Sequence, residues 1–240
     1  MGREPRRESA RADAGEARAE ALGVDEIGAT VRVEVDGVAV RVPVGTTILE
    51  AARAAGVRVP TLCHHADLPA GGNCYVCVVE VEGLKTLQAA CSYAVATPIS
   101  VRTRSARVRR ARRQIVELML SKHHGECYTC QRSGDCELRA LAEELGIDRL
   151  RFERALPSSR GVDRSSSSLW RDRNKCVLCR RCVRACGELQ EIGVLDVIGR
   201  GDRAEISTFL DKPIADVVCI HCGQCAVRCP TGALVPNDTT

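Results

Sequence analysis

The chain has 240 residues, and its 35 Lys and Arg against 31 Asp and Glu leave a formal net charge of +4. This small excess, with only one Trp, three Tyr and two Phe, argues against nucleic-acid binding, which uses basic surfaces and stacking aromatic side chains. Fifteen Cys without a secretory signal argue against a disulfide scaffold, and we expect reduced thiolates and a cytoplasmic location. Because aromatic side chains are few, bound metal should supply part of the folding free energy.

Residues 1–28 are predicted to form a flexible tail. The pair Arg6-Arg7 has the form of a twin-arginine export signal, but residues 8–28 contain no apolar segment and several acids, which argues against export signals and transit peptides. No apolar stretch of the chain approaches the roughly 20 residues that span a bilayer. We therefore expect no direct membrane insertion.

The first domain is expected over residues 29–105. Valines alternate at 31, 33 and 35 before an Asp36-Gly37 turn and at 38, 40 and 42 after it, which predicts a β-hairpin. Thr47 and Glu50 form the capping box that opens a short helix. Hairpin, helix and then cysteine loop is the order of a β-grasp ferredoxin.

That cysteine loop supplies the first candidate ligand set. Cys63, Cys74, Cys77 and Cys91 have the spacing C-x10-C-x2-C-x13-C, a stretched form of the plant-type ferredoxin pattern. The spacing favours a 2Fe-2S cluster, and a zinc site or plain core cysteines remain the alternatives at this point.

A second module is expected over residues 106–156, with helices from about 106 to 120 and from about 137 to 145 that clamp a metal site. Seven arginines between Arg102 and Arg113 are predicted to form a solvated helix face. The alternative is that they dock an acidic electron carrier or partner subunit.

Between these two helices lie His123, Cys127, Cys130 and Cys136, which offer three thiolates and one imidazole. Such a set can hold a 4Fe-4S cluster, and a neutral ligand in place of a thiolate tends to raise the cluster's reduction potential. His124 competes with His123 for the role of ligand. A zinc site with three cysteine ligands and one histidine is an equally open interpretation of the spacing.

A linker over residues 157–168, with Gly161 and four consecutive serines, is predicted to be a surface loop. The last domain, residues 169–240, contains the spacing C-x2-C-x2-C-x3-C twice, which is the pattern of a bacterial double 4Fe-4S ferredoxin. Zinc knuckles usually offer two C-x-x-C pairs, so the matched repeat favours cubane clusters over zinc.

In this pattern three thiolates hold one cubane and the fourth crosses to the other. The predicted sets are Cys176, Cys179, Cys182 with Cys229, and Cys219, Cys222, Cys225 with Cys186. Arg180, Arg181 and Arg184 lie inside the first run, as counter-charges for a cluster or as plain surface charges. The sequence Gly199-x-Gly201 resembles a dinucleotide fingerprint but leaves no room for a βαβ unit, and we interpret it as a turn.

In combination, these motifs resemble the electron-input region of iron-only hydrogenases and the start of the large iron–sulfur subunit of complex I and of some NAD-linked formate dehydrogenases. The resemblance rests on TLCHHADLPAGGNCYVCVVEVEG, HHGECYTCQRSGDCELRALAEELGI, RDRNKCVLCRRCVRACGELQ and CIHCGQCAVRCPTGAL, and covers residues 29 to 235. It implies an α+β protein with a β-grasp 2Fe-2S domain, a helical 4Fe-4S module ligated by one histidine and three cysteines, and a double 4Fe-4S ferredoxin domain. It makes Cys63, Cys74, Cys77 and Cys91 the 2Fe-2S ligands, and favours His123 over His124.

The resemblance implies an iron–sulfur relay between an NAD(P)H-oxidising flavoprotein subunit and a catalytic subunit of hydrogenase or formate dehydrogenase type. The relatives continue into a catalytic domain where this chain ends at Thr240, so we expect catalysis in a partner and no catalytic site on this chain. Tyr75 stands where relatives often carry arginine. The alternatives are an NADH:ferredoxin oxidoreductase subunit whose terminal clusters reduce soluble ferredoxin, and a zinc-stabilised interaction or nucleic-acid module.

Overall fold

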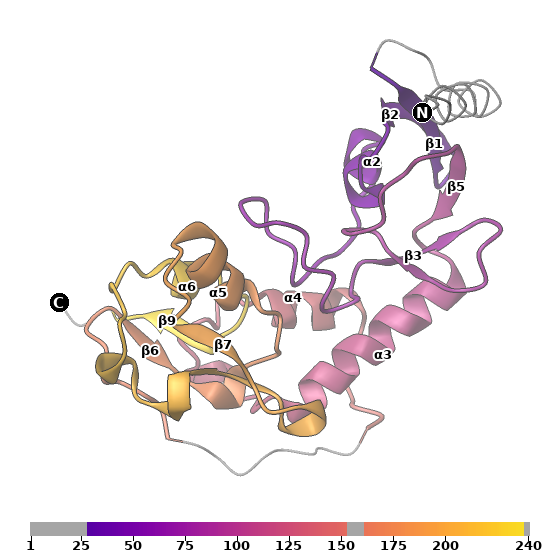
Figure 1. The fold of residues 1–240 in the computed structure, drawn as a ribbon. Helices are drawn as coiled ribbons and strands as arrows, with labels where there is room; N and C mark the ends of the chain where they lie inside the picture. The colour runs from indigo at the N-terminus through magenta and orange to yellow at the C-terminus, as the bar shows by residue number, and fades with distance from the viewer. Residues whose placement is uncertain (1–27, 153–160, 238–240) are drawn as a thin grey trace, which may run out of the picture. The chain divides into compact units, whose positions relative to one another are not determined.

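A computed structural model describes residues 28–152 and 161–237 of the protein (Figure 1). The chain divides into two compact units, of which the first comprises Met1–Val59 with Val79–Ser105 and the second Pro60–Val78 with Ala106–Thr240. The expected tail, apart from its last residue, and residues 157–160 of the expected linker lie outside the described residues.

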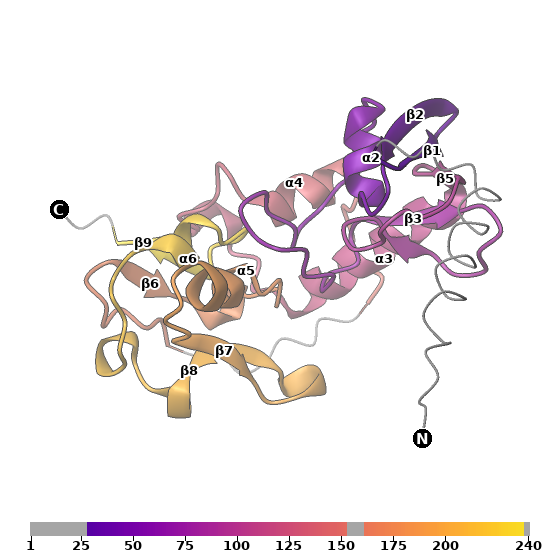
Figure 2. The same cartoon turned by 45° about the horizontal axis from the view of Figure 1, so that its top comes forward.

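The first unit contains a five-stranded sheet with strand order β2-β1-β5-β3-β4 (Figure 2). The strands are β1 (Thr30–Val35), β2 (Val38–Pro43), β3 (Val78–Val81), β4 (Gln88–Ala89) and β5 (Ile99–Arg102). β1 pairs antiparallel with β2 and parallel with β5. Asp36 and Gly37, at φ 48° and 89°, form the turn between β1 and β2, since a tight hairpin turn needs positive φ at both positions. The predicted hairpin is confirmed.

Helix α2 (Ile48–Ala54) begins at the predicted capping box. The Thr47 hydroxyl accepts a hydrogen bond from the Glu50 amide at 3.2 Å, and the Glu50 carboxylate accepts one from the Thr47 amide at 2.9 Å. Ile48 and Leu49 are buried in the same unit as the inward-facing valines of β1. The local sequence therefore fixes both the start of the helix and its buried face.

The second unit is built from short elements around the cysteine runs. Its α-helices are α3 (Ala106–Lys122), α4 (Glu137–Glu144), α5 (Arg181–Arg184) and α6 (Gln224–Val227). β6 (Leu169–Arg171) pairs with β9 (Leu234–Pro236), and β7 (Leu195–Ile198) with β8 (Glu205–Thr208). Single turns of 3-10 helix lie at Cys127–Thr129, Arg173–Lys175, Gly201–Arg203, Phe209–Asp211 and Ile214–Asp216, and a π-helical turn at Ala185–Leu189. Gly199 and Gly201 lie in the β7–β8 connection, which confirms the predicted turn.

Cysteine side chains form part of the core of this unit. One buried cluster combines Val116 of α3 and Leu138 and Leu141 of α4 with Cys63 and Cys179, among others. Five of the seven arginines of the expected solvated face are exposed. Arg112 is only 5% exposed and donates a hydrogen bond to the Val78 carbonyl at 2.7 Å, and the half-buried Arg113 pairs with the buried Glu117 at 3.0 Å. Across the residues described, no helix is both long and apolar enough to cross a membrane.

We predict that Thr47→Ala lowers the opening free energy of residues 48–54 by about 1 kcal/mol, because the helix loses its N-cap acceptor. Native-state hydrogen exchange resolved to these residues would measure the loss. Thr46→Ala is the matched control, since no side-chain hydrogen bond of Thr46 occurs within the described residues. Equal effects of the two substitutions would contradict the capping argument.

Candidate metal centres

The first ferredoxin set surrounds one hollow of the second unit. Cys176, Cys179, Cys182 and Cys229 all line it, although Cys229 lies more than forty residues from the other three. The Cys176 thiol also accepts a hydrogen bond from the Leu178 amide at 3.4 Å. Burial raises the pKa of Cys176 to about 11 and that of Cys179 to about 12. Clustered, buried thiols of this kind become thiolates when a cation binds them.

The second ferredoxin set surrounds a separate hollow, lined by Cys186, Cys219, Cys222 and Cys225 together with apolar side chains. Burial raises the pKa of Cys225 to about 12, whereas Cys222 is exposed. The Cys186 thiol accepts a hydrogen bond from the Val194 amide at 3.3 Å. The structure thus brings together each set in the crossed arrangement that the spacing predicts.

The third hollow is lined by His123, Cys127, Cys130 and Cys136, with His124 on the same wall. His123 is 7% exposed, and burial lowers its pKa to about 4, so the imidazole is neutral. The ring hydrogen-bonds to the Lys175 backbone, and its Nδ1 atom has no partner among the described residues. A neutral imidazole oriented by a backbone group, with an open nitrogen, is the form that binds a metal.

Because Gly232 has no side chain, its backbone can lie close to the Cys130 sulfur at this third hollow. A Cβ atom at Gly232 would lie 2.5 Å from the Cys130 sulfur and 3.2 Å from the Lys175 side chain. Both Lys175 and Gly232 line the hollow of the His123 set although they belong to the ferredoxin region. The third site therefore depends on residues that follow the linker, a feature that the spacing of ligands does not indicate.

The fourth set consists of buried cysteines on the segments around β3. Cys63, Cys74 and Cys77 belong to the second unit and Cys91 to the first, and all four are buried. The Cys63 amide donates a hydrogen bond to the Cys74 sulfur at 3.3 Å. A side-chain hydrogen bond with Cys63, followed by burial, raises the pKa of Cys74. Tyr75, between Cys74 and Cys77, adopts φ 57°.

The donors in all four sets are thiols and one imidazole, which is the chemistry of iron–sulfur clusters and also of zinc. Over residues 28–152 and 161–237, no group of three or more His, Cys, Asp or Glu side chains is arranged to hold a single metal ion. Three of the sets line hollows. The thiols and the imidazole that line these hollows are of the donor types that bind iron–sulfur clusters.

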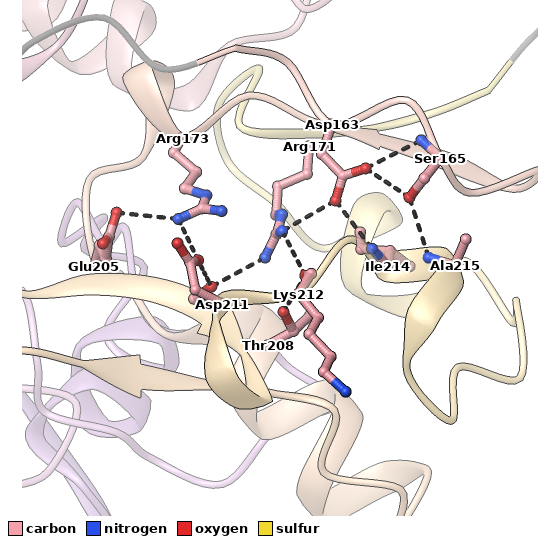
Figure 3. Close-up of polar contacts among 11 residues, drawn as sticks. Asp163, Ser165, Arg171, Arg173, Glu205, Thr208, Asp211, Lys212, Ile214 and Ala215 are labelled. Atoms are coloured by element: carbon pink, nitrogen blue, oxygen red, sulfur yellow. Dashed lines mark hydrogen bonds and ion pairs between the residues drawn. The ribbon is translucent and has the colours of Figure 1, made fainter.

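A buried ionic network connects the end of the linker with the ferredoxin region (Figure 3). Arg171, 3% exposed, donates to the Asp163 carboxylate at 3.0 Å and to the Lys212 carbonyl at 3.3 Å. Asp163 also accepts from the Ile214 amide at 3.0 Å. Residues 161–168 of the predicted surface loop contain no helix or strand, and Asp163 and the 2%-exposed Ser166 hold this segment against the ferredoxin region.

Comparisons with known proteins identify iron–sulfur domains in the regions that contain these cysteines. Three family models match in chain order: a 2Fe-2S iron-sulfur cluster binding domain (residues 28–106), the NADH-ubiquinone oxidoreductase-G iron-sulfur binding region (112–151) and a 4Fe-4S dicluster domain (175–233). Ferredoxin-type domains with mixed helix and strand content are thus confirmed, and the β-grasp subtype stays a prediction.

Among curated proteins, the chain is 42% identical over 212 residues to the NADP-reducing hydrogenase subunit HndD of Solidesulfovibrio fructosivorans, covering 86% of this chain and 36% of that protein. It is 33% identical to the mitochondrial NADH-ubiquinone oxidoreductase 78 kDa subunit of Candida albicans, covering 86% of this chain and 28% of that one. The chain thus spans about a third of the length of these relatives. A chain in the crystal structure of an NAD+-reducing NiFe hydrogenase matches with a TM-score of 0.80 and 32% identity, over 87% of this chain and 88% of that chain.

We predict that Gly232→Ala prevents assembly of the cluster of the His123 set, because the added methyl group would displace the Cys130 sulfur. Iron analysis and EPR should show the loss of one four-iron cluster, with the other signals retained. Gly134→Ala is the control, since Gly134 lies between the ligands Cys130 and Cys136 and a Cβ there meets nothing within 4 Å. A Gly232→Ala protein with its full iron content would refute the dependence.

Proposed function

We propose that this chain, which belongs to the family of iron–sulfur subunits of NAD(P)-linked hydrogenases and complex I-like oxidoreductases, relays electrons between an NAD(P)H-oxidising flavoprotein and a separate catalytic subunit. The observation that carries the proposal is that three complete ligand sets each line their own hollow, in addition to a fourth set of buried cysteines. All fifteen cysteines are used in these sets, so no thiol is left for another chemistry.

The proposed cofactors are one 2Fe-2S cluster and three 4Fe-4S clusters. Such clusters accept and donate single electrons at potentials set by ligand type, charge, hydrogen bonds and exposure. The chain's own residues would bind the clusters, exclude water from them and fix their spacing. A two-electron donor such as NAD(P)H needs a flavin to release its electrons one at a time, so a flavoprotein is the partner that this chemistry calls for.

The proposal of a separate catalytic subunit, of hydrogenase or formate dehydrogenase type, is supported by similarity. A chain in the crystal structure of an NAD+-reducing NiFe hydrogenase is matched over 88% of its residues at 32% identity. Reduced thiol ligands also suit the cytoplasm, which we propose as the location.

A second candidate is a subunit of an NADH:ferredoxin oxidoreductase, and the surface around the second ferredoxin set favours it. Cys222 is exposed, and its neighbours Val218 and Ile220 are 83% and 54% exposed. Such a surface would give a small soluble ferredoxin access to the last cluster. NADH-dependent reduction of added ferredoxin by the assembled complex, without a hydrogenase or dehydrogenase subunit, would select this alternative.

We predict that anaerobically purified protein contains about fourteen iron and fourteen sulfide per chain, with EPR signals of one 2Fe-2S and three 4Fe-4S clusters on stepwise reduction. Zinc instead of iron at the His123 set would interrupt the relay. A colourless protein with zinc throughout would refute electron transfer and favour a zinc-stabilised module.

We predict that His123→Ala removes one 4Fe-4S cluster while His124→Ala keeps it. Both rings have a buried nitrogen without a partner among the described residues, but His123 is the more buried of the two and hydrogen-bonds to the Lys175 backbone. His123→Cys should retain the cluster at a lower midpoint potential, since a thiolate makes it one charge more negative. EPR-monitored redox titration measures both effects. Cluster loss in His124→Ala alone would transfer the ligand role to His124.

A further inference from the structure

The three arginines of the first ferredoxin run differ sharply in environment. Arg180 is exposed, whereas Arg181 and Arg184, at the two ends of helix α5, are 3% and 7% exposed. The two buried guanidinium groups lie between predicted ligands of both ferredoxin sets, since Cys182 falls between them and Cys186 follows Arg184 by two residues. A buried arginine needs hydrogen-bond acceptors and a counter-charge.

Arg181 has both. Its guanidinium donates to the two carboxylate oxygens of Glu137 at 2.6 and 2.8 Å, and Glu137 directly follows the predicted ligand Cys136. It also donates to the His64 carbonyl at 2.8 Å, next to Cys63. Arg181 therefore fixes three ligand-bearing segments to one another, and its charge is neutralised by Glu137.

Among the described residues, Arg184 has hydrogen-bond acceptors but no carboxylate as a counter-charge. Its two terminal nitrogens donate to the carbonyls of Cys63 and Pro69, and its Nε has no partner within residues 28–152 and 161–237. No carboxylate in that part of the chain forms an ion pair with it. The loop that contains Pro69 and Gly71 also packs tightly against the Arg184 guanidinium, because a Cβ at Gly71 would lie 3.0 Å from the Arg184 Cζ atom.

A buried cation held only by neutral carbonyls is strongly unfavourable unless a negative group lies nearby. One of the two carbonyls belongs to Cys63, a predicted thiolate ligand of the 2Fe-2S set. A cluster with four thiolate ligands is an anion, and it gains one further negative charge when the titrant donates one electron to it. A cluster bound by the Cys63 set would therefore supply the missing counter-charge.

We propose that Arg184 is a positioning residue that acts as the counter-charge of the 2Fe-2S cluster and raises its reduction potential. This inference rests on the proposed function, because it requires a cluster on the Cys63 set. Arg181 fixes the same loop without changing the charge near it. Of the two arginines, only Arg184 therefore contributes an unneutralised positive charge beside this loop.

The test is an EPR-monitored redox titration of the full chain. In Arg184→Met the 2Fe-2S midpoint should fall by about 59 mV or more, a tenfold or larger change in the one-electron reduction equilibrium. Arg184→Lys, which keeps the charge, should keep the wild-type midpoint. The matched control is Arg180→Met, which removes an exposed arginine of the same run and should leave that midpoint unchanged.

An intact 2Fe-2S cluster with an unshifted midpoint in Arg184→Met would overturn the inference, as would an equal shift in Arg180→Met. If Arg184→Met fails to assemble the cluster, the Arg184→Lys variant becomes the test of the counter-charge. Assembly with the wild-type midpoint supports the counter-charge, and failure to assemble shows that the two-carbonyl fork, not the charge, is required. Absence of a 2Fe-2S signal in the wild-type protein would instead overturn the proposed relay.

Discussion

Cys176, Cys179 and Cys182 are packed together in the interior of the ferredoxin region, where burial raises the pKa of each thiol above its ordinary value. Without a bound cation these groups are stable only as thiols, and a metal cluster is bound only by thiolates. Cys182 and Cys229 also belong to the apolar core of this region, together with Leu169 and Leu234. We therefore expect metal binding and folding to be coupled, because the predicted ligands are also core side chains.

The ligand loops impose the same backbone on two unrelated stretches of sequence. Leu178 and His221 occupy equivalent positions of the two runs and have φ of 55° and 57°, and the next pair, Arg180 and Gly223, has φ of 60° and 70°. Only Gly adopts this conformation without steric cost. Arg180 thus carries backbone strain that Gly223 avoids, and both runs nevertheless adopt the same loop conformation.

The elements that could be predicted from the sequence are those with local causes. The Asp36-Gly37 turn and the Thr47–Glu50 capping box depend on residues at most three apart, and the structure confirms both. The crossed ferredoxin sets could be predicted because the spacing repeats, and their residues do meet around two hollows.

The features that the sequence did not reveal all depend on distant residues. Arg184 contacts Cys63 over 121 positions, and Arg181 contacts Glu137 over 44, so nothing near them in the chain shows that they are buried. Gly232 and Cys130 are also far apart in the sequence, and a single glycine does not by itself indicate that its backbone lies close to a cysteine. The burial of these charged side chains could therefore be recognised only from the three-dimensional structure.

The two ferredoxin hollows, alike in ligands and backbone, differ in their charged surroundings. Arg171, Arg173 and Arg180 line the first, while the described residues that line the second include no charged side chain apart from the thiols themselves. The first two arginines are neutralised, Arg171 by Asp163 at 3.0 Å and Arg173 by Asp211 at 2.5 Å. Since charge and exposure both tune a cluster's potential, identical ligand sets on one pseudo-symmetric lobe do not imply identical redox behaviour. The charges around the two predicted sites thus differ through residues that flank the cysteines, and we propose that Arg184 acts by the same means at Cys63.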